Sequence, residues 1–279
     1  MPKIVAGVDS STQSVKVVLR EADSGELIAS TSRPHPDGTE VDPREWKQAL
    51  DSALDEVSKY KIDAISIGGQ QHGMVALDSE GKVIRHALLW NDTRSDKAAL
   101  DLNHEIPDIH NRTGSQLVAS FTASKVRWLA DNEKANADKV AAIALPHDWL
   151  SWRLTGAANI DTLFTDRSDA SGTGYFDSVK NEYCRDIFAT ALRSNREVVL
   201  PTIIAPHKFG GATTSGANIA AGAGDNAGAA LGLGASVGDL VISLGTSGTA
   251  FAVSSTPTHD SSGEVAGFAD ATGNFLPLA

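Results

Sequence analysis

The stretch KIVAGVDSSTQSVKVVLRE, residues 3–21, decides how the N-terminal part of this chain folds. Two apolar runs, residues 4–8 and 15–19, are separated by Asp9 and a series of small or polar residues. This pattern predicts two strands joined by a tight turn. Successive backbone N–H groups and hydroxyls in such a turn bind phosphate, and Mg²⁺ on a phosphate is usually held by one or two carboxylates. Asp9 is therefore a candidate magnesium ligand beside a phosphate-binding turn.

A second stretch, DLVISLGTSGTAFAVSS at residues 239–255, repeats this design. One such turn alone is most simply explained as an ordinary hairpin turn, whose serines and threonines bond to their own backbone. Two turns of one design, the first preceded by an acid, favour nucleotide phosphate instead. Similar hairpins this far apart indicate a duplicated domain. We expect a first domain over residues 1–236 and the start of a second over residues 237–279, with one more strand within residues 267–279.

The composition excludes several classes of protein. A net charge of −11 argues against a general nucleic-acid binder, which needs a basic surface. A single cysteine, Cys184, rules out an internal disulfide. The N-terminus lacks the pattern of a signal peptide, and no apolar run reaches the ~18 residues that mark a membrane span. We therefore expect a soluble, cytoplasmic protein that acts without nucleic acid or membrane.

The rest of the chain alternates strand patterns with helix patterns. A helix is expected from Pro43 to about residue 60, because Asp42 is a good N-cap and Glu45 completes a capping box. The other predicted elements are strands at 26–30 and 62–69, a hairpin at 73–90 with its turn near 79–81, helices at 94–103, 122–131, 147–154 and 181–192, and a strand, glycine turn and helix over 217–236. Alternation of this kind predicts an α/β fold.

The stretch GAGDNAGAALG, residues 222–232, places Asp225 after a glycine turn at the start of a predicted helix. Three interpretations are open. Asp225 can be a simple helix N-cap. The glycines can form a dinucleotide fingerprint, although the preceding strand is short and no acid follows about twenty residues on. Asp225 can also be a general base at the mouth of a cleft, with Asn226 beside it as a ligand for a hydroxyl group.

Two further stretches carry polar and aromatic groups at predicted strand ends. GGQQHGMV, residues 68–75, contains Gln71 and His72, and LLWNDTRS, residues 88–95, contains Trp90. Amides, an imidazole and an indole are the groups that hold hydroxyl-rich sugars. The alternatives are a buried histidine with a satisfied hydrogen bond and a tryptophan that only packs in the core. The histidines show no paired metal spacing such as HxxxH, and no GxSxG nucleophile motif is present.

Seven stretches in chain order together resemble the N-terminal part of the FGGY family of carbohydrate kinases. They are GVDSSTQSVKV, IGGQQHGMVALD, ALLWNDTRS, LPHDWLSWRLTG, TDRSDASGTGYFD, AGAGDNAGAALGLG and LVISLGTSGTAF, and they cover nearly the whole chain. The resemblance implies a ribonuclease H-like fold of the actin, hexokinase and Hsp70 ATPase type, with the beginning of a second similar domain. It also implies transfer of the ATP γ-phosphate to the terminal hydroxyl of a ketopentose, with D-xylulose as the expected sugar.

The resemblance also implies roles for individual residues. Asp225 would be the catalytic base, and Asp9 would lie near Mg²⁺. The implied sugar ligands are Gln71, His72, Trp90 and Asn226, and the implied phosphate ligands are Thr12, Gly245, Thr246 and Ser247. The expected partners are ATP and a small sugar. The resemblance is also compatible with a homodimer.

Other functions remain open at this point. Within the family, L-ribulose, glycerol, gluconate or a deoxyketohexose are alternative substrates. A non-metabolic ATPase of the same fold would keep both phosphate turns without the sugar ligands, and a sugar-binding module would keep the sugar ligands without catalysis. A nicotinamide dehydrogenase fits least. Because the family's adenosine-binding glycine motif does not occur before Ala279, we expect this chain alone to bind ATP weakly.

Overall fold

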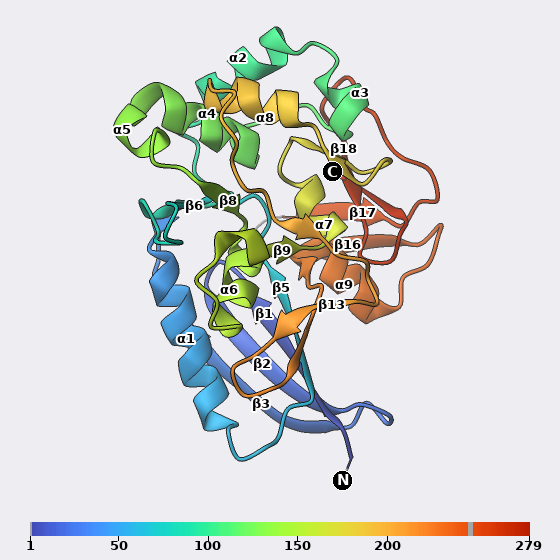
Figure 1. Cartoon of the computed structure of the whole chain (residues 1–279). Helices are drawn as coiled ribbons and strands as arrows, with labels where there is room; N and C mark the ends of the chain where they lie inside the picture. Colours follow the sequence, from blue (N-terminus) through green and yellow to red (C-terminus); the bar gives the residue numbers. More distant parts are fainter. Residues whose placement is uncertain (1, 245–247) are drawn as a thin grey trace.

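The computed structural model describes residues 2–244 and 248–279. Its largest element is a mixed sheet with the strand order β13-β14-β5-β1-β2-β3, in which β15 also pairs with β5 (Figure 1). β1, β14 and β15 each pair with β5 in parallel, whereas β2, β3 and β13 pair antiparallel with their neighbours. The strands are β1 (Ile4–Ser10), β2 (Ser14–Glu21), β3 (Leu27–Pro34), β5 (Ala64–Gly69), β13 (Phe209–Ala212), β14 (Asn218–Ala220) and β15 (Ala223–Gly224). The α/β prediction is confirmed.

The first hairpin forms as the sequence predicts. Its side chains alternate between the two faces of the sheet, as the strand period of two requires. Ala6 and Val8 of β1 and Val17 and Leu19 of β2 are buried on one face, while Asp9 lies on the other face and is exposed. This alternation fixes the register of the strands, and it brings the Asp9 carboxylate to the accessible side of the sheet.

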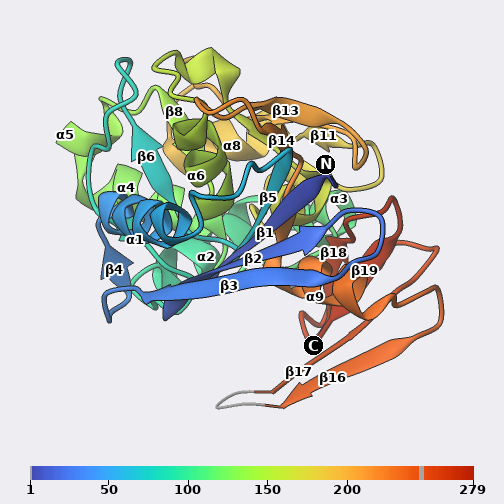
Figure 2. The same ribbon diagram turned by 90° about the horizontal axis from the view of Figure 1, so that it is seen from below.

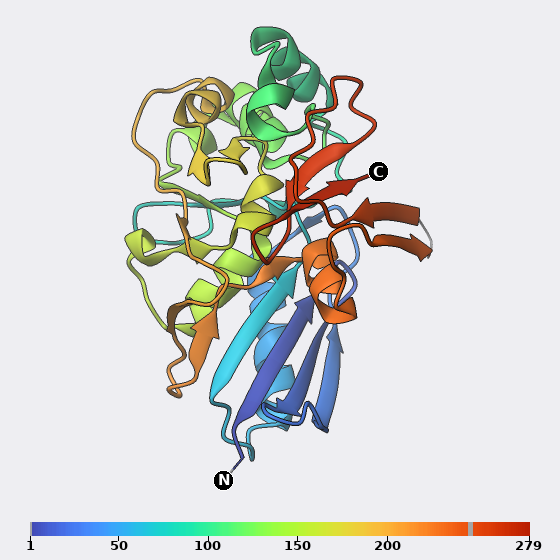
Figure 3. The ribbon, with the colours of Figure 1, turned by 90° about the vertical axis from the view of Figure 1, so that its right-hand side faces the viewer.

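Two helices cover the apolar face of the sheet. α1 (Pro43–Glu56) begins as predicted, because the Asp42 side chain accepts the Arg44 N–H at 3.0 Å. The predicted capping box is wrong, because the Glu45 side chain makes no hydrogen bond to the Asp42 N–H. The helix packs against β2 and β3 through Trp46 and Leu50, and it ends four residues before the predicted residue 60. α6 (Pro146–Leu154) packs against β5 and contacts α1. Figure 3 shows β1, β2, β3 and β5 side by side with α1 behind them.

A second, mainly helical layer lies beyond the far end of the sheet (Figure 1). It has its own apolar core, in which α4 packs against both α2 and α8. The helices are α2 (Asp96–Glu105), α3 (Ile109–Thr113), α4 (Thr122–Asn132), α5 (Lys134–Ala137) and α8 (Arg185–Leu192). The predicted helix over 181–192 was too long, because residues 182–183 form β11 (Glu182–Tyr183) against β10 (Phe176–Asp177).

The C-terminal residues form a separate sheet with the order β16-β17-β19-β18. β16 (Leu240–Leu244) and β17 (Gly248–Ala252) form the predicted second hairpin, and they project from the body of the molecule in Figure 2. The single strand expected after residue 266 is wrong. Two strands, β18 (Ala266–Ala269) and β19 (Phe275–Leu278), form there because Asp270 Oδ1 accepts the N–H groups of Thr272, Gly273 and Asn274 and so reverses the chain.

Short strands between the layers also differ from prediction. The chain turns at residues 78–82 as expected, since the Asp78 N–H donates to Lys82 O at 2.9 Å. The flanking segments mainly pair elsewhere, however: β6 (Val75–Leu77) with β8 (Ala142–Ala144), and β7 (Ala87–Leu88) with β4 (Glu40–Val41). The remaining elements are η1 (Ile160–Thr162), β9 (Phe164–Thr165), α7 (Arg167–Ser171), β12 (Thr202–Ile203) and α9 (Asp225–Leu233). Among the described residues, no helix has the length and apolar character needed to cross a membrane.

Candidate active site

The parallel strands β1, β5 and β15 end at one edge of the sheet, and most of the candidate residues lie at or just after these strand ends. In the register, Asp9 of β1 pairs with Gly68 of β5, and Gly68 pairs with Ala223 of β15. Gln71 follows the end of β5, and Asp225 immediately follows β15. Ligands in open α/β sheets bind at this edge, beyond the carboxyl ends of the strands.

Gln71 lies directly against β15, the strand that ends just before Asp225. A Cβ built on Gly224 would lie 2.6 Å from Gln71 Nε2, so only a glycine allows this approach. The Gln71 amide is buried and donates to Ser168 O at 3.2 Å. The side chain is therefore held in one orientation beside the strand end.

Asp225 is the first residue of α9, and its neighbour Asn226 orients its carboxylate. Asp225 Oδ1 accepts the Asn226 backbone N–H at 2.8 Å and the Asn226 Nδ2 at 3.0 Å. The side chain is accessible at the surface, yet desolvation by the surrounding protein raises the pKa of Asp225 to about 6, and the charge of Asp9 adds to this. The N-cap residue is Gly224, so the interpretation of Asp225 as a simple N-cap is wrong. Since the Asp225 carboxylate does not cap the helix, it is available to accept a proton.

Asp9 has the chemistry of a magnesium ligand. Carboxylate oxygens are the donors that Mg²⁺ prefers. Although the Asp9 side chain is accessible, desolvation by the surrounding protein raises its pKa, and the charges of Lys16 and His35 oppose this. The Asp9 charge also raises the pKa of Asp225. A divalent cation held by Asp9 would relieve this repulsion, so the residues present fit the cation that the fold family implies.

Thr12 and Trp90 meet although 78 residues separate them in the chain. The indole Nε1 of Trp90 donates to Thr12 Oγ1 at 2.9 Å. Trp90 is 43% exposed, so the core-packing alternative for this residue is wrong. The bond joins the first turn to an aromatic side chain that is partly accessible to solvent.

His72 is a partly satisfied histidine in a strained backbone conformation. Its φ is 70°, a left-handed value that is rare for a residue with a side chain. Nδ1 lies 2.6 Å from Gly172 O and donates to it, and the ring packs against Phe121 and Phe268. Burial lowers the pKa of His72 to about 4, although the hydrogen bond to Gly172 opposes this. The imidazole is therefore neutral, and its unprotonated Nε2 can only accept a hydrogen bond.

The residues of the second turn, Gly245, Thr246 and Ser247, lie outside the described residues. The strands on either side of them pair as predicted. Their assignment to phosphate stays a prediction.

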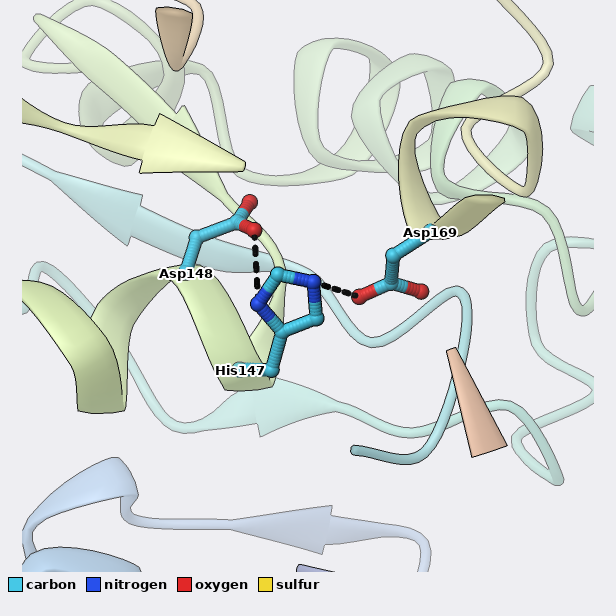
Figure 4. A group of neighbouring side chains, drawn as sticks. All are labelled: His147, Asp148 and Asp169. Atoms are coloured by element: carbon cyan, nitrogen blue, oxygen red, sulfur yellow. Dashed lines mark ion pairs between the residues drawn. The ribbon is translucent and has the colours of Figure 1, made fainter. Parts of the chain in front are cut away.

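A buried charged cluster beneath the sheet edge was not predicted (Figure 4). His147 Nδ1 lies 3.2 Å from Asp148 Oδ1, and its Nε2 lies 3.1 Å from Asp166 Oδ1 and 3.4 Å from Asp169 Oδ2. Burial alone would lower the pKa of His147, but the three surrounding aspartates raise it to about 10. Burial raises the pKa of Asp169 well above its usual value. Within the cluster, the pKa values of both His147 and Asp169 are therefore raised.

Three of these side chains have the spacing of a metal site. His147, Asp148 and Asp169 each offer a ligand atom within 4.8 Å of the others. Protons on the two imidazole nitrogens explain the arrangement better than a metal ion does, because each nitrogen already faces a carboxylate oxygen at hydrogen-bonding or ion-pair distance. The signal in the sequence was the density of acids and serines in TDRSDAS, residues 165–171, which all lie in buried positions.

The sheet order and the acidic site at the ends of its parallel strands define an α/β domain of the ribonuclease H-like, actin-type ATPase class. A family model described as "FGGY family of carbohydrate kinases, N-terminal domain" matches residues 4–234. The chain belongs to the FGGY family of carbohydrate kinases.

Individual relatives agree with this assignment. The chain is 44% identical over 293 residues to the xylulose kinase of Streptomyces coelicolor, covering 99% of this chain and 60% of the relative. It is 34% identical to the xylulose kinase of Escherichia coli K12, covering 89% and 54%. The crystal structure of xylulose kinase from Bifidobacterium adolescentis matches with a TM-score of 0.96 and 44% identity over 100% of this chain and 64% of that one. The chain thus spans about 60% of the length of the first of these relatives.

The fold alone does not specify the sugar. A gluconate kinase structure from Lactobacillus acidophilus matches with a TM-score of 0.90 at only 23% identity. That likeness concerns the fold, so the substrate has to be argued from the site.

Proposed function

We propose that this chain carries the sugar site and part of the phosphate site of a cytoplasmic kinase that transfers the γ-phosphate of ATP to D-xylulose, giving D-xylulose 5-phosphate. The observation that carries the proposal is the position of Asp225 beside Gln71 and near Asp9 at one edge of the sheet. The choice of D-xylulose is supported by the 44% and 34% identity to the xylulose kinases of S. coelicolor and E. coli. L-Ribulose, glycerol and gluconate are the alternative acceptors.

Asp225 acts as the general base in this proposal. Phosphoryl transfer depends mostly on positioning and on charge stabilisation, and the base has only to accept the proton of the attacking hydroxyl. A base works best when its pKa lies near the working pH, and the pKa of Asp225 is raised to about 6. Since Asn226 holds Oδ1, Oδ2 is the oxygen that receives the proton of the terminal sugar hydroxyl.

The sugar is held by Gln71, His72, Trp90 and Asn226. Because His72 is neutral with its proton on Nδ1, its Nε2 accepts a hydrogen bond from a sugar hydroxyl. The exposed ring of Trp90 covers the C–H side of the sugar. These groups bring the terminal hydroxyl to Asp225, and positioning of this kind accounts for a large share of the rate in such reactions.

The phosphates lie over the first turn in this proposal. The Thr12 hydroxyl accepts from Trp90 and keeps its own proton to donate to a phosphate oxygen. Asp9 holds the cation, directly or through water, and Mg²⁺ when bound supplies neutralisation of the charge on the transferred phosphate. Gly245, Thr246 and Ser247 would complete the phosphate contacts.

A sugar panel tests the proposal. ADP release is measured with Mg·ATP and D-xylulose, L-ribulose, glycerol, gluconate or no sugar, with the protein in its full natural length. We expect release that depends on sugar and is fastest with D-xylulose. If another acceptor were phosphorylated faster, that acceptor would replace D-xylulose as the proposed substrate. Sugar-independent release would favour a non-metabolic ATPase, and sugar binding without any release would favour a binding module.

A further inference from the structure

The buried His147 lies directly under the two strand ends that carry the proposed sugar ligand and the proposed base. A Cβ built on Gly69, the last residue of β5, would lie 2.9 Å from the His147 Cβ. A Cβ built on Gly222, just before β15, would lie 3.3 Å from the His147 Nδ1. The backbone and Cβ of His147 therefore pack against Gly69 and its imidazole packs against Gly222, and the two glycines provide the space for this residue.

A chain of hydrogen bonds leads from this histidine to both strand ends. His147 Nε2 lies 3.1 Å from Asp166 Oδ1, and Asp166 Oδ2 accepts the Ser168 hydroxyl at 2.5 Å and the Ser168 N–H at 2.7 Å. The same hydroxyl oxygen of Ser168 accepts the Gly224 N–H at 3.1 Å. The Ser168 carbonyl accepts Gln71 Nε2 at 3.2 Å. One buried residue thus bonds to the backbone next to Asp225 and to the side chain of Gln71.

We propose that Ser168, fixed by Asp166 and His147, is a positioning residue of the phosphoryl-transfer reaction, which sets the place of Asp225 relative to Gln71. The inference rests on the proposed function and adds to it a residue that touches neither sugar nor ATP. The Ser168 hydroxyl both donates and accepts, so its proton has one orientation, toward the Asp166 carboxylate. Buried polar networks whose members are satisfied hold one arrangement.

The aspartate–histidine pair explains why this serine is held so firmly. Asp166 Oδ1 also accepts the Asp169 N–H at 3.1 Å, so the carboxylate caps the first turn of α7 while it bonds to the serine. His147 Nε2 lies 3.1 Å from the same Oδ1, so the buried Asp166 carboxylate has an ion-pair partner as well as its hydrogen bonds. Without the Ser168 hydroxyl the Gly224 N–H has no partner from α7, and the turn before Asp225 is free to shift.

Two matched variants test the proposal. Ser168→Ala removes the hydroxyl that links α7 to Gly224. Ser151→Ala removes an equally buried hydroxyl one turn after His147 on α6, which has no hydrogen-bond partner among the described residues. Because a shift of about 1 Å can cost about 10²-fold in rate, we expect Ser168→Ala to lose roughly 10- to 100-fold in kcat for sugar phosphorylation, with sugar KM changed less than about threefold. We expect Ser151→Ala to keep kcat within about twofold.

Amide hydrogen exchange supplies a readout that does not need activity. In Ser168→Ala, the Gly224 amide should exchange at least about tenfold faster, because it loses its buried acceptor, and in Ser151→Ala it should stay as in the wild type. Unchanged exchange at Gly224, or equal kcat in the two variants, overturns the positioning role. If the wild type phosphorylates no sugar, the proposed function fails and the positioning role fails with it. The exchange rates still show whether the link exists.

Discussion

Lowering the pH through 6 is expected to switch off sugar phosphorylation by protonating Asp225. Desolvation raises the pKa of this group to about 6, with the charge of Asp9 as a further contribution. A group with that pKa is about 97% ionised at pH 7.5 and only about 9% ionised at pH 5, whereas an aspartate at its usual value would still be more than about 90% ionised at pH 5. The value of kcat/KM should therefore fall about tenfold between pH 7.5 and pH 5.

The assay is kcat/KM for D-xylulose at saturating Mg·ATP over this range of pH. A carbon-13 titration of the Asp225 carboxyl group, recorded without ATP and sugar, separates the titration of the enzyme from that of the nucleotide. We expect the carboxyl curve to have its midpoint near pH 6, and the rate curve to have its midpoint at or somewhat below that pH, because Mg²⁺ at Asp9 relieves part of the repulsion. A carboxyl midpoint near 4, together with a flat rate profile down to pH 5, would refute the argument that desolvation tunes this base.

Three other predictions concern stability and binding. Asp225→Asn should unfold at higher temperature than the wild type at pH 7, because a carboxyl whose folded pKa is raised costs stability once it is ionised, and the difference should vanish below about pH 4. Trp90→Phe removes the 2.9 Å bond to Thr12 and should raise the sugar KM several-fold, with little change in melting temperature because the ring is 43% exposed. Burial lowers the pKa of Lys125 to about 7. The free energy of unfolding of the wild type, measured relative to that of the Lys125→Met variant, should therefore increase as the pH rises from about 7 toward 10.5. The raised pKa of His147 makes the stability of both proteins fall over much of the same pH range, so only the difference in stability between them tests the role of Lys125. A difference that stays constant with pH would contradict this prediction.

Local patterns in the sequence were enough to predict the parts of the fold that depend on neighbouring residues. The two apolar runs at residues 4–8 and 15–19, with small polar residues between them, predicted the hairpin that carries Asp9, and Asp42 with Pro43 predicted the start of α1. The glycine turn before Asp225 predicted that this residue begins a helix, which it does as the first residue of α9. Each of these features is specified by hydrogen bonds and side-chain periodicity within a short segment.

The features that were missed depend on partners far away in the chain. β6 was expected to pair within its own hairpin, but its longest ladder is formed with residues 142–144. The bond between Trp90 and Thr12 and the contacts of His147 with Asp166 and Asp169 join segments that no local pattern relates. A buried histidine surrounded by acids has no periodic signature, because its charge is stabilised by the fold and not by its neighbours in sequence.

The measurement that tests the account most directly is the identity and rate of the phosphorylated product in three forms of the protein in its full natural length. D-Xylulose and Mg·ATP are supplied to the wild type, to Asp225→Asn and to the exposed control Asp161→Asn, and the product is followed by phosphorus NMR. The account predicts D-xylulose 5-phosphate from the wild type and from the control at similar rates. It predicts a rate about 10²- to 10⁴-fold lower from Asp225→Asn, with sugar binding retained. Near-normal turnover by Asp225→Asn would contradict the account.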